Sequence, residues 1–473
     1  MLVKYVSLFP EAILMAMLIS IALVHIFRQA QTPKTFATIS KICMFLSLIL
    51  CIIFYNIGIN GDWYINTTYT TFFKGLMLLG ALLTGSLASK WFLSQNYSSH
   101  KYYFCIGFMV LSFCVSISAQ NLILMAGAML VSVLGSSYLL MMNREVTEQK
   151  ISKLCYIQDS IIFMLLMGIG VSVIVWHSKE WSYSGIIAYY KKVPPQTEDI
   201  IASCLILSGI MSIIGAAPFH LQAVHTAKYN ILPVVVFMEI IPVITGVAIL
   251  VTLFHTVFVA MNEPLSTMMK LCGCLSVLMG AIGAGSTLNI RKIYQNVGLF
   301  NIGIMLILFS YLTVQDIQVG LIYFLIYLFS IFGIFSCFYG LCSHGEYINN
   351  LDDLAGINET KPYIAAALLI FSISLLGIPP LVGLLGNLYM TKLLIAHQSI
   401  KMLGFIFFML VVLSHGLLRI FKTIYFEKKK INFDRADKGV YFSLFLNILI
   451  IIITMIDPQF LIDDIEDIIH SFL

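Results

Sequence analysis

Long apolar runs follow one another along almost the whole chain, and they restrict its fold more than any motif does. A helix needs about 20 apolar residues to cross the hydrocarbon core of a bilayer. The sequence contains fourteen runs of this kind, at residues 7–27, 41–59, 71–93, 102–119, 121–142, 155–176, 200–217, 231–258, 266–287, 293–312, 317–342, 363–386, 402–424 and 440–456. The loops between them are too short for a soluble domain, so we predict an all-α membrane protein with about 14 transmembrane helices.

The charge content agrees with a chain that lipid covers. Only 11% of the 473 residues are charged and 60% are apolar, whereas soluble domains carry about 25% charged residues. This difference excludes a soluble enzyme, a disordered chain and a nucleic-acid-binding protein. The 10 cysteines form no CxxC pair and nearly all lie in the apolar runs. We therefore expect no metal or iron–sulfur site and no redox centre in this chain.

The distribution of Lys and Arg predicts the orientation in the membrane. Most of the 27 basic residues fall in loops that follow the odd-numbered apolar runs, and loops rich in these residues face the cytoplasm or the mitochondrial matrix. We expect both termini on the opposite side, in the periplasm or the intermembrane space. Residues 457–473 combine apolar and acidic side chains without Lys or Arg, which is typical of an amphipathic helix on a membrane or partner surface.

Two of the apolar runs are interrupted by glycine and proline. One ends in Gly215-Ala-Ala-Pro218-Phe-His220, and another contains Gly377-Ile-Pro379-Pro380. Proline removes a backbone donor and opens a helix, and broken helices in corresponding positions of two repeats point to the ion path of a transporter. The breaks lie five runs apart, which predicts two inverted five-helix repeats with one broken helix each. Two unrelated proline kinks are the alternative.

These breaks divide the chain into four predicted segments. The four segments are a three-helix segment (1–101), a first antiporter-like repeat (102–258), a second antiporter-like repeat (266–424), and a last helix with the acidic tail (425–473).

Several motifs around the breaks carry a family resemblance. They are Leu8-Phe-Pro-Glu11, Pro218-Phe219-His220 with Pro233, Asn289-Ile-Arg291-Lys292, Tyr323 with Tyr327 and Gly333, Asp353-Leu-Ala-Gly356 with Pro362, Ser374-Leu-Leu-Gly-Ile-Pro-Pro-Leu-Val-Gly383, and Leu418-Arg419 with Lys422 and Tyr425-Phe426. With these motifs the chain resembles the antiporter-like membrane subunits of respiratory complex I. The Gly-Ile-Pro-Pro form looks like that of subunit N rather than that of its sister subunit M.

The resemblance implies a role in proton translocation. Members of this family have fourteen helices with two inverted repeats. Electron transfer from NADH to quinone in other subunits drives the proton translocation that these members carry out. The resemblance implies FMN and iron–sulfur clusters in partner subunits, with no cofactor and no direct NADH binding in this chain. The implied partners are the other membrane-arm subunits and the lipid bilayer. The implied location is the bacterial inner membrane or the mitochondrial inner membrane.

The chain departs from the family at the residues that carry protons. Proton transfer through a membrane needs titratable groups inside the protein. Aligned by their neighbours, the family's helix 5 glutamate falls on Met129 and the next lysine on Cys155. The lysines of helices 7, 8 and 12 fall on Ile213, Val243 and Asn387. The ionisable residues of the family's proton path are therefore missing from this chain at these five positions. The Asn387 amide could still hydrogen-bond a chain of water molecules.

Other ionisable residues lie inside the apolar runs. Asp159 lies four residues after Cys155 and Glu239 four residues before Val243, so each shares a helix face with the position that lost its charge. A charge in mid-membrane costs about 2.5–3.5 kcal/mol on insertion scales. The candidate proton-path residues are Asp159, Glu239, His220, Lys153 and Asn387. Four residues are interpreted as groups near the membrane edge that reach the headgroups, namely Glu11, Lys74, Lys392 and His415.

Three functional hypotheses follow. In the first, Asp159 and Glu239 form a displaced proton relay in a complex I subunit; alternatively, each of them pairs locally or faces a neighbouring subunit. In the second, the chain is a structural subunit that holds its place in the membrane arm without moving protons. In the third, it belongs to a multi-subunit cation/proton antiporter, which shares the fold.

Overall fold

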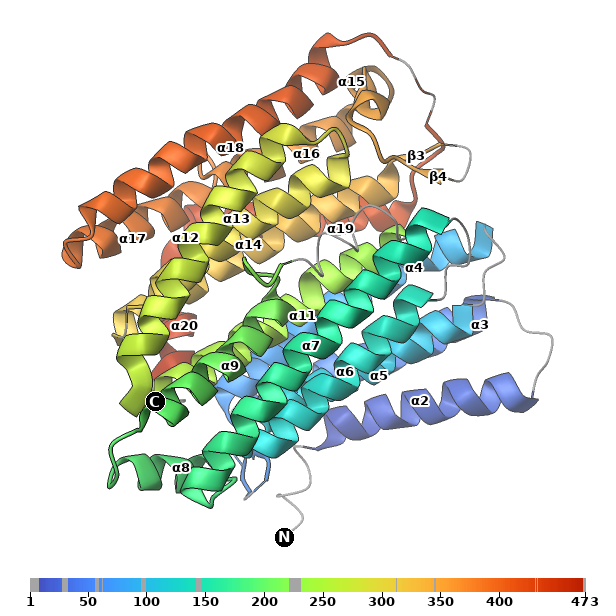
Figure 1. The fold of residues 1–473 in the computed structure, drawn as a ribbon. Helices are drawn as coiled ribbons and strands as arrows, with labels where there is room; N and C mark the ends of the chain where they lie inside the picture. Colours follow the sequence, from blue (N-terminus) through green and yellow to red (C-terminus); the bar gives the residue numbers. More distant parts are fainter. Residues whose placement is uncertain are drawn as a thin grey trace. The chain divides into compact units, whose positions relative to one another are not determined.

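The computed structural model describes residues 8–27, 33–55, 59–61, 63–94, 99–141, 147–220, 231–311, 313–343, 346–429, 431 and 433–470. The chain forms two compact units. The first unit comprises Met1–Ile214, Tyr229–Leu265 and Ile468–Leu473, and the second comprises Gly215–Lys228 and Ser266–Asp467. Each unit is a helical bundle, shown in the colours of the sequence in Figure 1.

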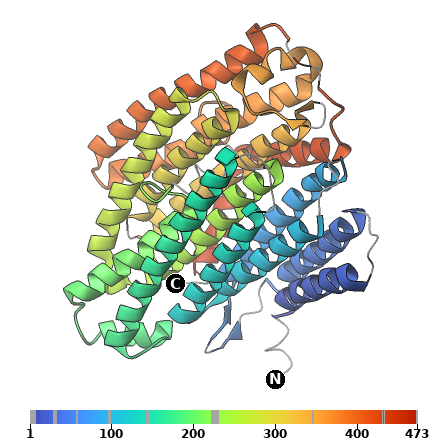
Figure 2. The same ribbon diagram turned by 45° about the vertical axis from the view of Figure 1, so that its right-hand side comes forward.

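The first unit is built almost entirely from helices. Its elements are α2 (Phe9–Phe27), α3 (Pro33–Ile53), β1 (Ile59–Asn60), β2 (Ile65–Asn66), α4 (Thr68–Ser94), α5 (Ser99–Ser118), α6 (Leu122–Met141), α7 (Thr147–Ser178), α8 (Tyr183–Tyr190), α9 (Thr197–Ile214), α11 (Leu232–Thr252), the π-helix η1 (Leu253–Val257) and the 3-10 helix η2 (Val259–Met261). The strands β1 and β2 pair as a short antiparallel hairpin. Helices α2 and α3 pack side by side, as Figure 2 shows.

Helix α11 lies at the centre of the first unit. It packs against α4, α5 and α9, and nearly all of its side chains are buried. Apart from Glu239 and two threonines, its sequence is apolar on every face, and a helix of that kind is stable only when other helices surround it. The Tyr69 hydroxyl of α4 donates to the carbonyl of Ala248 at 2.8 Å, so this buried hydroxyl group has a hydrogen-bond partner in the core.

The second unit contains both halves of a broken helix. Its elements are α12 (Asn262–Ser286, whose first residues belong to the first unit), α13 (Ile290–Phe309), α14 (Val314–Gly340), β3 (Cys342–Ser343), β4 (Glu346–Tyr347), the 3-10 helix η3 (Leu351–Leu354), α15 (Ile357–Thr360), α16 (Pro362–Leu376), α17 (Gly383–Ala396), α18 (Ile400–Phe426), α19 (Lys438–Ile456) and α20 (Pro458–His470, whose last residues belong to the first unit). The strands β3 and β4 also pair as a short hairpin.

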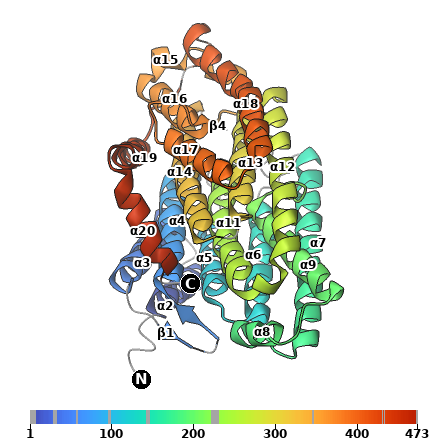
Figure 3. The same ribbon diagram turned by 90° about the vertical axis from the view of Figure 1, so that its left-hand side faces the viewer.

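Helix α14 is the centre of the second unit. It packs against α13, α16, α17 and α19, and it is buried over nearly its whole length. Helix α18 runs along both α16 and α17 and so bridges the broken helix (Figure 1). Figure 3 shows α20 turning away from α19, and the Gln318 amide of α14 donates to the Ile462 carbonyl of α20 at 3.4 Å.

The membrane-spanning helices agree with the predicted class. Among the described residues, thirteen helices are long and apolar enough to cross a membrane, and α16 and α17 are two shorter apolar helices. The predicted run 363–386 ends ten residues too early, because the helix after the break continues to Ala396. The polar Asn387 and Lys392 hid that continuation in the sequence. The predicted loop 177–199 contains the short helix α8.

Candidate functional site

The second helix break is a well-formed helix end within the membrane-spanning region. Helix α16 stops at Leu376, and Gly377 takes the left-handed conformation with φ of 69°. The Gly377 amide donates to the Ser374 carbonyl at 3.0 Å, and the Ile378 amide donates to the Ile373 carbonyl at 3.3 Å. This is the Schellman pattern, in which glycine is favoured because it has no Cβ. Pro379 and Pro380 follow and are both exposed. The helix cannot continue through them because proline has no backbone N–H donor.

Asn387 of α17 completes this break. Its side-chain amide donates to the carbonyls of Leu376 and Gly377 at 3.2 and 3.4 Å, and the residue is buried. These carbonyls are among those that a helix end leaves without a partner. A lysine is the family's residue at this position by the sequence resemblance; in this chain a neutral amide joins the two halves of the broken helix.

The replacement Asn387→Leu tests this role of the side chain. It leaves both carbonyls without their amide donor, and we expect a loss of about 1 kcal/mol in the free energy of unfolding, since both hydrogen bonds are long. Equilibrium unfolding of the purified chain in mixed micelles measures the loss. The control Leu388→Ala alters an exposed neighbour and should change stability less; equal losses in the two variants would contradict the role.

The first helix break has the same spacing. Helix α9 stops at Ile214, Gly215 has φ of 78°, and Pro218 lies three residues later, as Pro380 does after Gly377. The Ala217 amide that the break frees donates to the Ser276 hydroxyl of α12 at 2.8 Å. His220 is buried. Its Nδ1 atom has no hydrogen-bond partner among the described residues. Residues 221–230 lie outside the described residues.

A row of polar but uncharged side chains surrounds α14. The Tyr323 hydroxyl donates to the Asn301 side-chain oxygen at 2.8 Å. The hydroxyls of Ser330 and Ser374 lie 2.8 Å apart. The hydroxyls of Tyr294 and Ser372 lie 2.7 Å apart on α13 and α16.

These groups can relay hydrogen bonds, but none of them stores a proton near neutral pH. Helices α13, α14 and α16 carry no Lys, Arg, Asp, Glu or His beyond their first turns.

Two pairs of polar contacts in the second unit place ionisable groups at helix ends. His397 Nε2 lies 2.9 Å from Asp316 Oδ1, between the end of α17 and the start of α14. Lys361 precedes α16, and its ammonium group donates to the carbonyls of Gly340 and Asp434. Burial lowers the pKa of Lys361 below its ordinary value. At these two places, ionisable side chains join the ends of neighbouring helices.

In the first unit, two positions that the family resemblance assigns to ionisable groups hold buried apolar side chains. Met129 of α6 and Val243 of α11 are almost completely buried. Cys155 of α7 and Ile213 of α9 are partly exposed. Met and Val neither bind nor release protons, so these interior positions contribute packing.

The predicted relay residues occupy different helices of the first unit. Asp159 on α7 is partly exposed and makes no hydrogen bond or ion pair with the described side chains. Glu239 on α11 is half-buried and takes part in an interaction. Helix α9 packs against both α7 and α11. The side chain of Lys153 lies outside the described part of the chain. The relay stays a prediction.

A buried cluster of charge lies elsewhere in the first unit. Lys74 of α4 is 1% exposed, and its ammonium nitrogen lies 2.7 Å from Glu11 Oε1 of α2. The Tyr64 hydroxyl donates to the same carboxylate oxygen at 2.7 Å and accepts from Lys74 at 2.6 Å. The side-chain oxygen of Asn66 lies 3.4 Å from the Lys74 nitrogen. Burial raises the pKa of the Tyr64 phenol, which keeps it a neutral donor.

This cluster corrects the interpretation of Glu11 and Lys74 as groups that reach the headgroups. Both are buried and paired, because α2 and α4 begin at the same end of the first unit and bring opposite charges together. The sequence carried a signal for this: the two charges lie near the starts of the first and third apolar runs, which enter the membrane from the same side. Glu11 Oε2 has no hydrogen-bond partner among the described residues.

Among the described residues, no three His, Cys, Asp or Glu side chains lie close enough together to hold a metal ion. The cysteines that the structure describes are free thiols.

Comparison with known proteins gives one consistent family. The sequence profile described as "NADH:quinone oxidoreductase/Mrp antiporter, TM" matches residues 119–414. The NADH-quinone oxidoreductase subunit N of Pelagibacter ubique is 26% identical over 416 residues, which cover 86% of each chain. Subunit N of Rickettsia bellii is 28% identical over 319 residues, covering 67% of this chain and 69% of that one.

Solved structures share the fold at low sequence identity. A chain of respiratory complex I from Thermus thermophilus has a TM-score of 0.79 at 17% identity and covers 96% of this chain and 98% of that one. A chain of the Mrp complex from Dietzia sp. DQ12-45-1b has a TM-score of 0.85 at 13% identity, with 100% and 98% covered. The two helix breaks, at residues 215–218 and 377–380, both lie in the region that the family profile covers.

Proposed function

Because this chain belongs to the NADH:quinone oxidoreductase/Mrp antiporter transmembrane family, we propose that it is a subunit of type N in the membrane arm of an NADH–quinone oxidoreductase. That complex couples electron transfer from NADH to quinone to proton translocation. Its flavin and iron–sulfur centres belong to partner subunits, and this chain contributes helices rather than redox chemistry. In the same proposal, both termini lie on the periplasmic or intermembrane side of an inner membrane.

The paired helix breaks carry this proposal. Each has a left-handed glycine followed three residues later by a proline, and each has a freed backbone group that a polar side chain satisfies. Irregular backbone inside a membrane is stable only where the protein or a water-filled cavity satisfies it, and such breaks line the ion paths of transporters. The relatives named subunit N favour this complex over a cation/proton antiporter.

Affinity purification tests the assembly. A tag on this chain should co-purify a membrane complex with NADH–quinone oxidoreductase activity from gently solubilised membranes. The recovery of sodium/proton exchange subunits without that activity would instead support the antiporter assignment.

A second candidate is a structural role without a proton path of its own. The uncharged row around α14 and the apolar Met129 and Val243 favour it, since a proton relay needs groups that change charge. In this case the chain holds its neighbours in place, and its removal breaks the membrane arm although no proton crosses it.

Glu239→Gln separates the two roles. If Glu239 belongs to a displaced relay with Asp159, the substitution lowers the number of protons moved per electron pair, because glutamine cannot take up a proton. NADH-driven proton pumping by the assembled complex in sealed vesicles measures this number. The control is Glu180→Gln, which changes an exposed loop carboxylate. An unchanged stoichiometry in the Glu239→Gln complex would refute the relay and support the structural role.

A further inference from the structure

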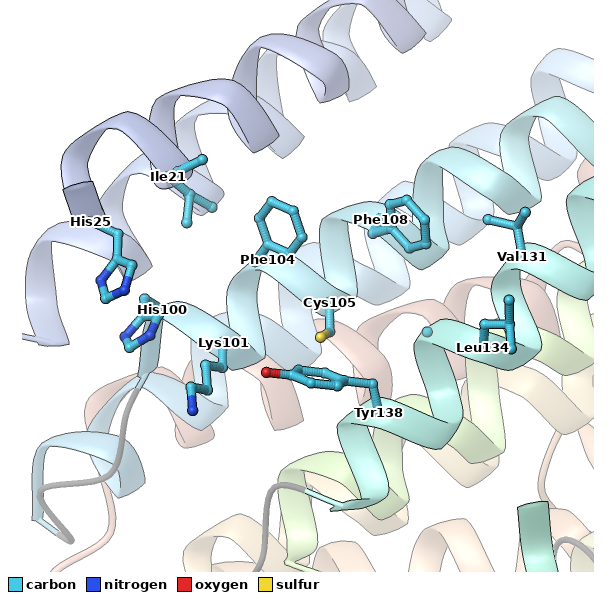
Figure 4. A pocket seen from close by; sticks show the side chains of 12 residues that line it. Ile21, His25, His100, Lys101, Phe104, Cys105, Phe108, Val131, Leu134 and Tyr138 are labelled. Carbon is cyan, nitrogen blue, oxygen red and sulfur yellow. The ribbon is translucent and has the colours of Figure 1, made fainter.

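An apolar groove opens between α2, α5 and α6 of the first unit, shown in Figure 4. Its volume is about 550 Å³, within the range of about 300–1,000 Å³ usual for pockets that bury a small ligand. Phe104 and Phe108 of α5 line it together with Ile21 of α2 and Val131 and Leu134 of α6. The wall is almost entirely hydrocarbon and aromatic, which suits an acyl chain.

Basic side chains gather at one end of this groove. The imidazoles of His25 and His100 stack with centroids 4.0 Å apart, and Lys101 and the phenol of Tyr138 lie beside them (Figure 4). No carboxylate is among the residues that line the groove. This end therefore offers hydrogen-bond donors and positive charge to an anion.

The depth of these groups matches a phospholipid. His25 lies in the last turn of α2, and His100 and Lys101 lie in the first turn of α5, where the apolar helices meet the headgroup region. Phe108 lies seven residues further along α5, which is about 10 Å deeper at 1.5 Å per residue. The groove thus runs from a mouth lined by one lysine and two imidazoles at the membrane edge into the hydrocarbon region.

We propose that this groove binds an anionic phospholipid, with the headgroup phosphate at His25, His100 and Lys101 and an acyl chain along Phe104, Phe108 and Leu134. Basic pockets between transmembrane helices recognise anionic headgroups through the same combination of charge and depth. A second groove, between α6, α7 and neighbouring residues, is larger at about 930 Å³ but has a single lysine, Lys179, on its wall. It provides an internal comparison whose lysine has no histidine beside it.

Native mass spectrometry of the purified full-length chain tests the headgroup contact. The probes are phosphatidylglycerol and phosphatidylcholine with identical acyl chains. The chain should retain phosphatidylglycerol preferentially, and Lys101→Gln should weaken that retention about five-fold, the effect of one basic residue at an anionic membrane surface. The control Lys179→Gln removes the lysine of the other groove and should leave the preference unchanged. Equal retention of both lipids, or equal effects of the two variants, overturns the proposal.

A second pair of variants tests the apolar part. Leu134→Trp fills the groove without touching the basic end and should reduce phosphatidylglycerol retention, whereas Leu130→Trp, one turn away on α6 and outside the groove, should not. Unfolding midpoints of both variants show whether each is folded. If inorganic phosphate displaces the lipid and Leu134→Trp has no effect, the site takes a free anion. If protein subunits co-purify only when the groove is unfilled, a protein covers it. Either outcome refutes the lipid assignment.

Discussion

Replacing Lys74 with methionine is expected to lower the free energy of unfolding by about 3–5 kcal/mol, the usual result of removing one partner of a buried ion pair. The ammonium group is 1% exposed and contacts Glu11, Tyr64 and Asn66. Without it, the Glu11 carboxylate stays buried with one neutral donor, the Tyr64 hydroxyl. Its charge then has no counter-charge, although its side chain is only 10% exposed to solvent and an unpaired buried charge is costly. Equilibrium unfolding of the purified chain in mixed micelles measures the loss.

A double variant shows whether the loss comes from the stranded charge. Lys74→Met combined with Glu11→Gln removes both charges and keeps the hydrogen bond to Tyr64, so it should be more stable than Lys74→Met alone. Lys401→Met, at an exposed position at the start of α18, is the matched control and should change stability by less than about 0.5 kcal/mol. A double variant as unstable as the single one would show that the pair contributes packing rather than charge compensation.

The second large effect is expected at Gly383, where α17 begins. A Cβ atom on this residue would overlap the Ser374 carbonyl oxygen and lie 3.0 Å from the Gly377 Cα. Both contacts are backbone, so no side-chain rotation can relieve them. Gly383→Ala should therefore lower the free energy of unfolding by about 1–3 kcal/mol, as overpacked substitutions do, and should loosen the joint between α16 and α17.

Gly404→Ala is the matched control for this prediction. Gly404 lies in the second turn of α18 with nothing within 4 Å of an added Cβ, and alanine is a better helix former than glycine by up to about 1 kcal/mol. The control should be neutral or stabilising. Unfolding midpoints of the two variants provide the comparison, and similar midpoints would show that the break tolerates a wider separation of its halves.

The architecture could be predicted from the sequence because a membrane restricts the structures that the backbone can form. Apolar runs of about 20 residues can form only helices there, and glycine and proline mark where a helix opens. The predicted breaks at Pro218, Pro379 and Pro380 coincide with the observed ends of α9 and α16. The end of α17 was missed, since Asn387 and Lys392 lower the hydropathy of a segment that remains helical.

The ionisable residues were harder to interpret. Hydropathy indicates that a charge in the membrane is energetically costly, but it does not predict which opposite charge lies beside that charge in the folded chain. Glu11 and Lys74 are 63 positions apart in the sequence and become an ion pair only because α2 and α4 start at the same level. Asp159 and Glu239 sit one turn from positions that the family uses, but a shared helix face in the sequence does not bring two helices together.

The sequence by itself determined the membrane class, the approximate number of helices and the two places where helices break, since each of these follows from local composition and backbone chemistry. Only the tertiary structure decided which polar groups meet: Asn387 with the open end of α16, Ser276 with the amide of Ala217, and Lys74 with Glu11. It also brought His25 to His100 at the mouth of an apolar groove. The physical reason is that apolar periodicity defines helices one at a time, whereas hydrogen bonds and ion pairs between helices depend on their packing.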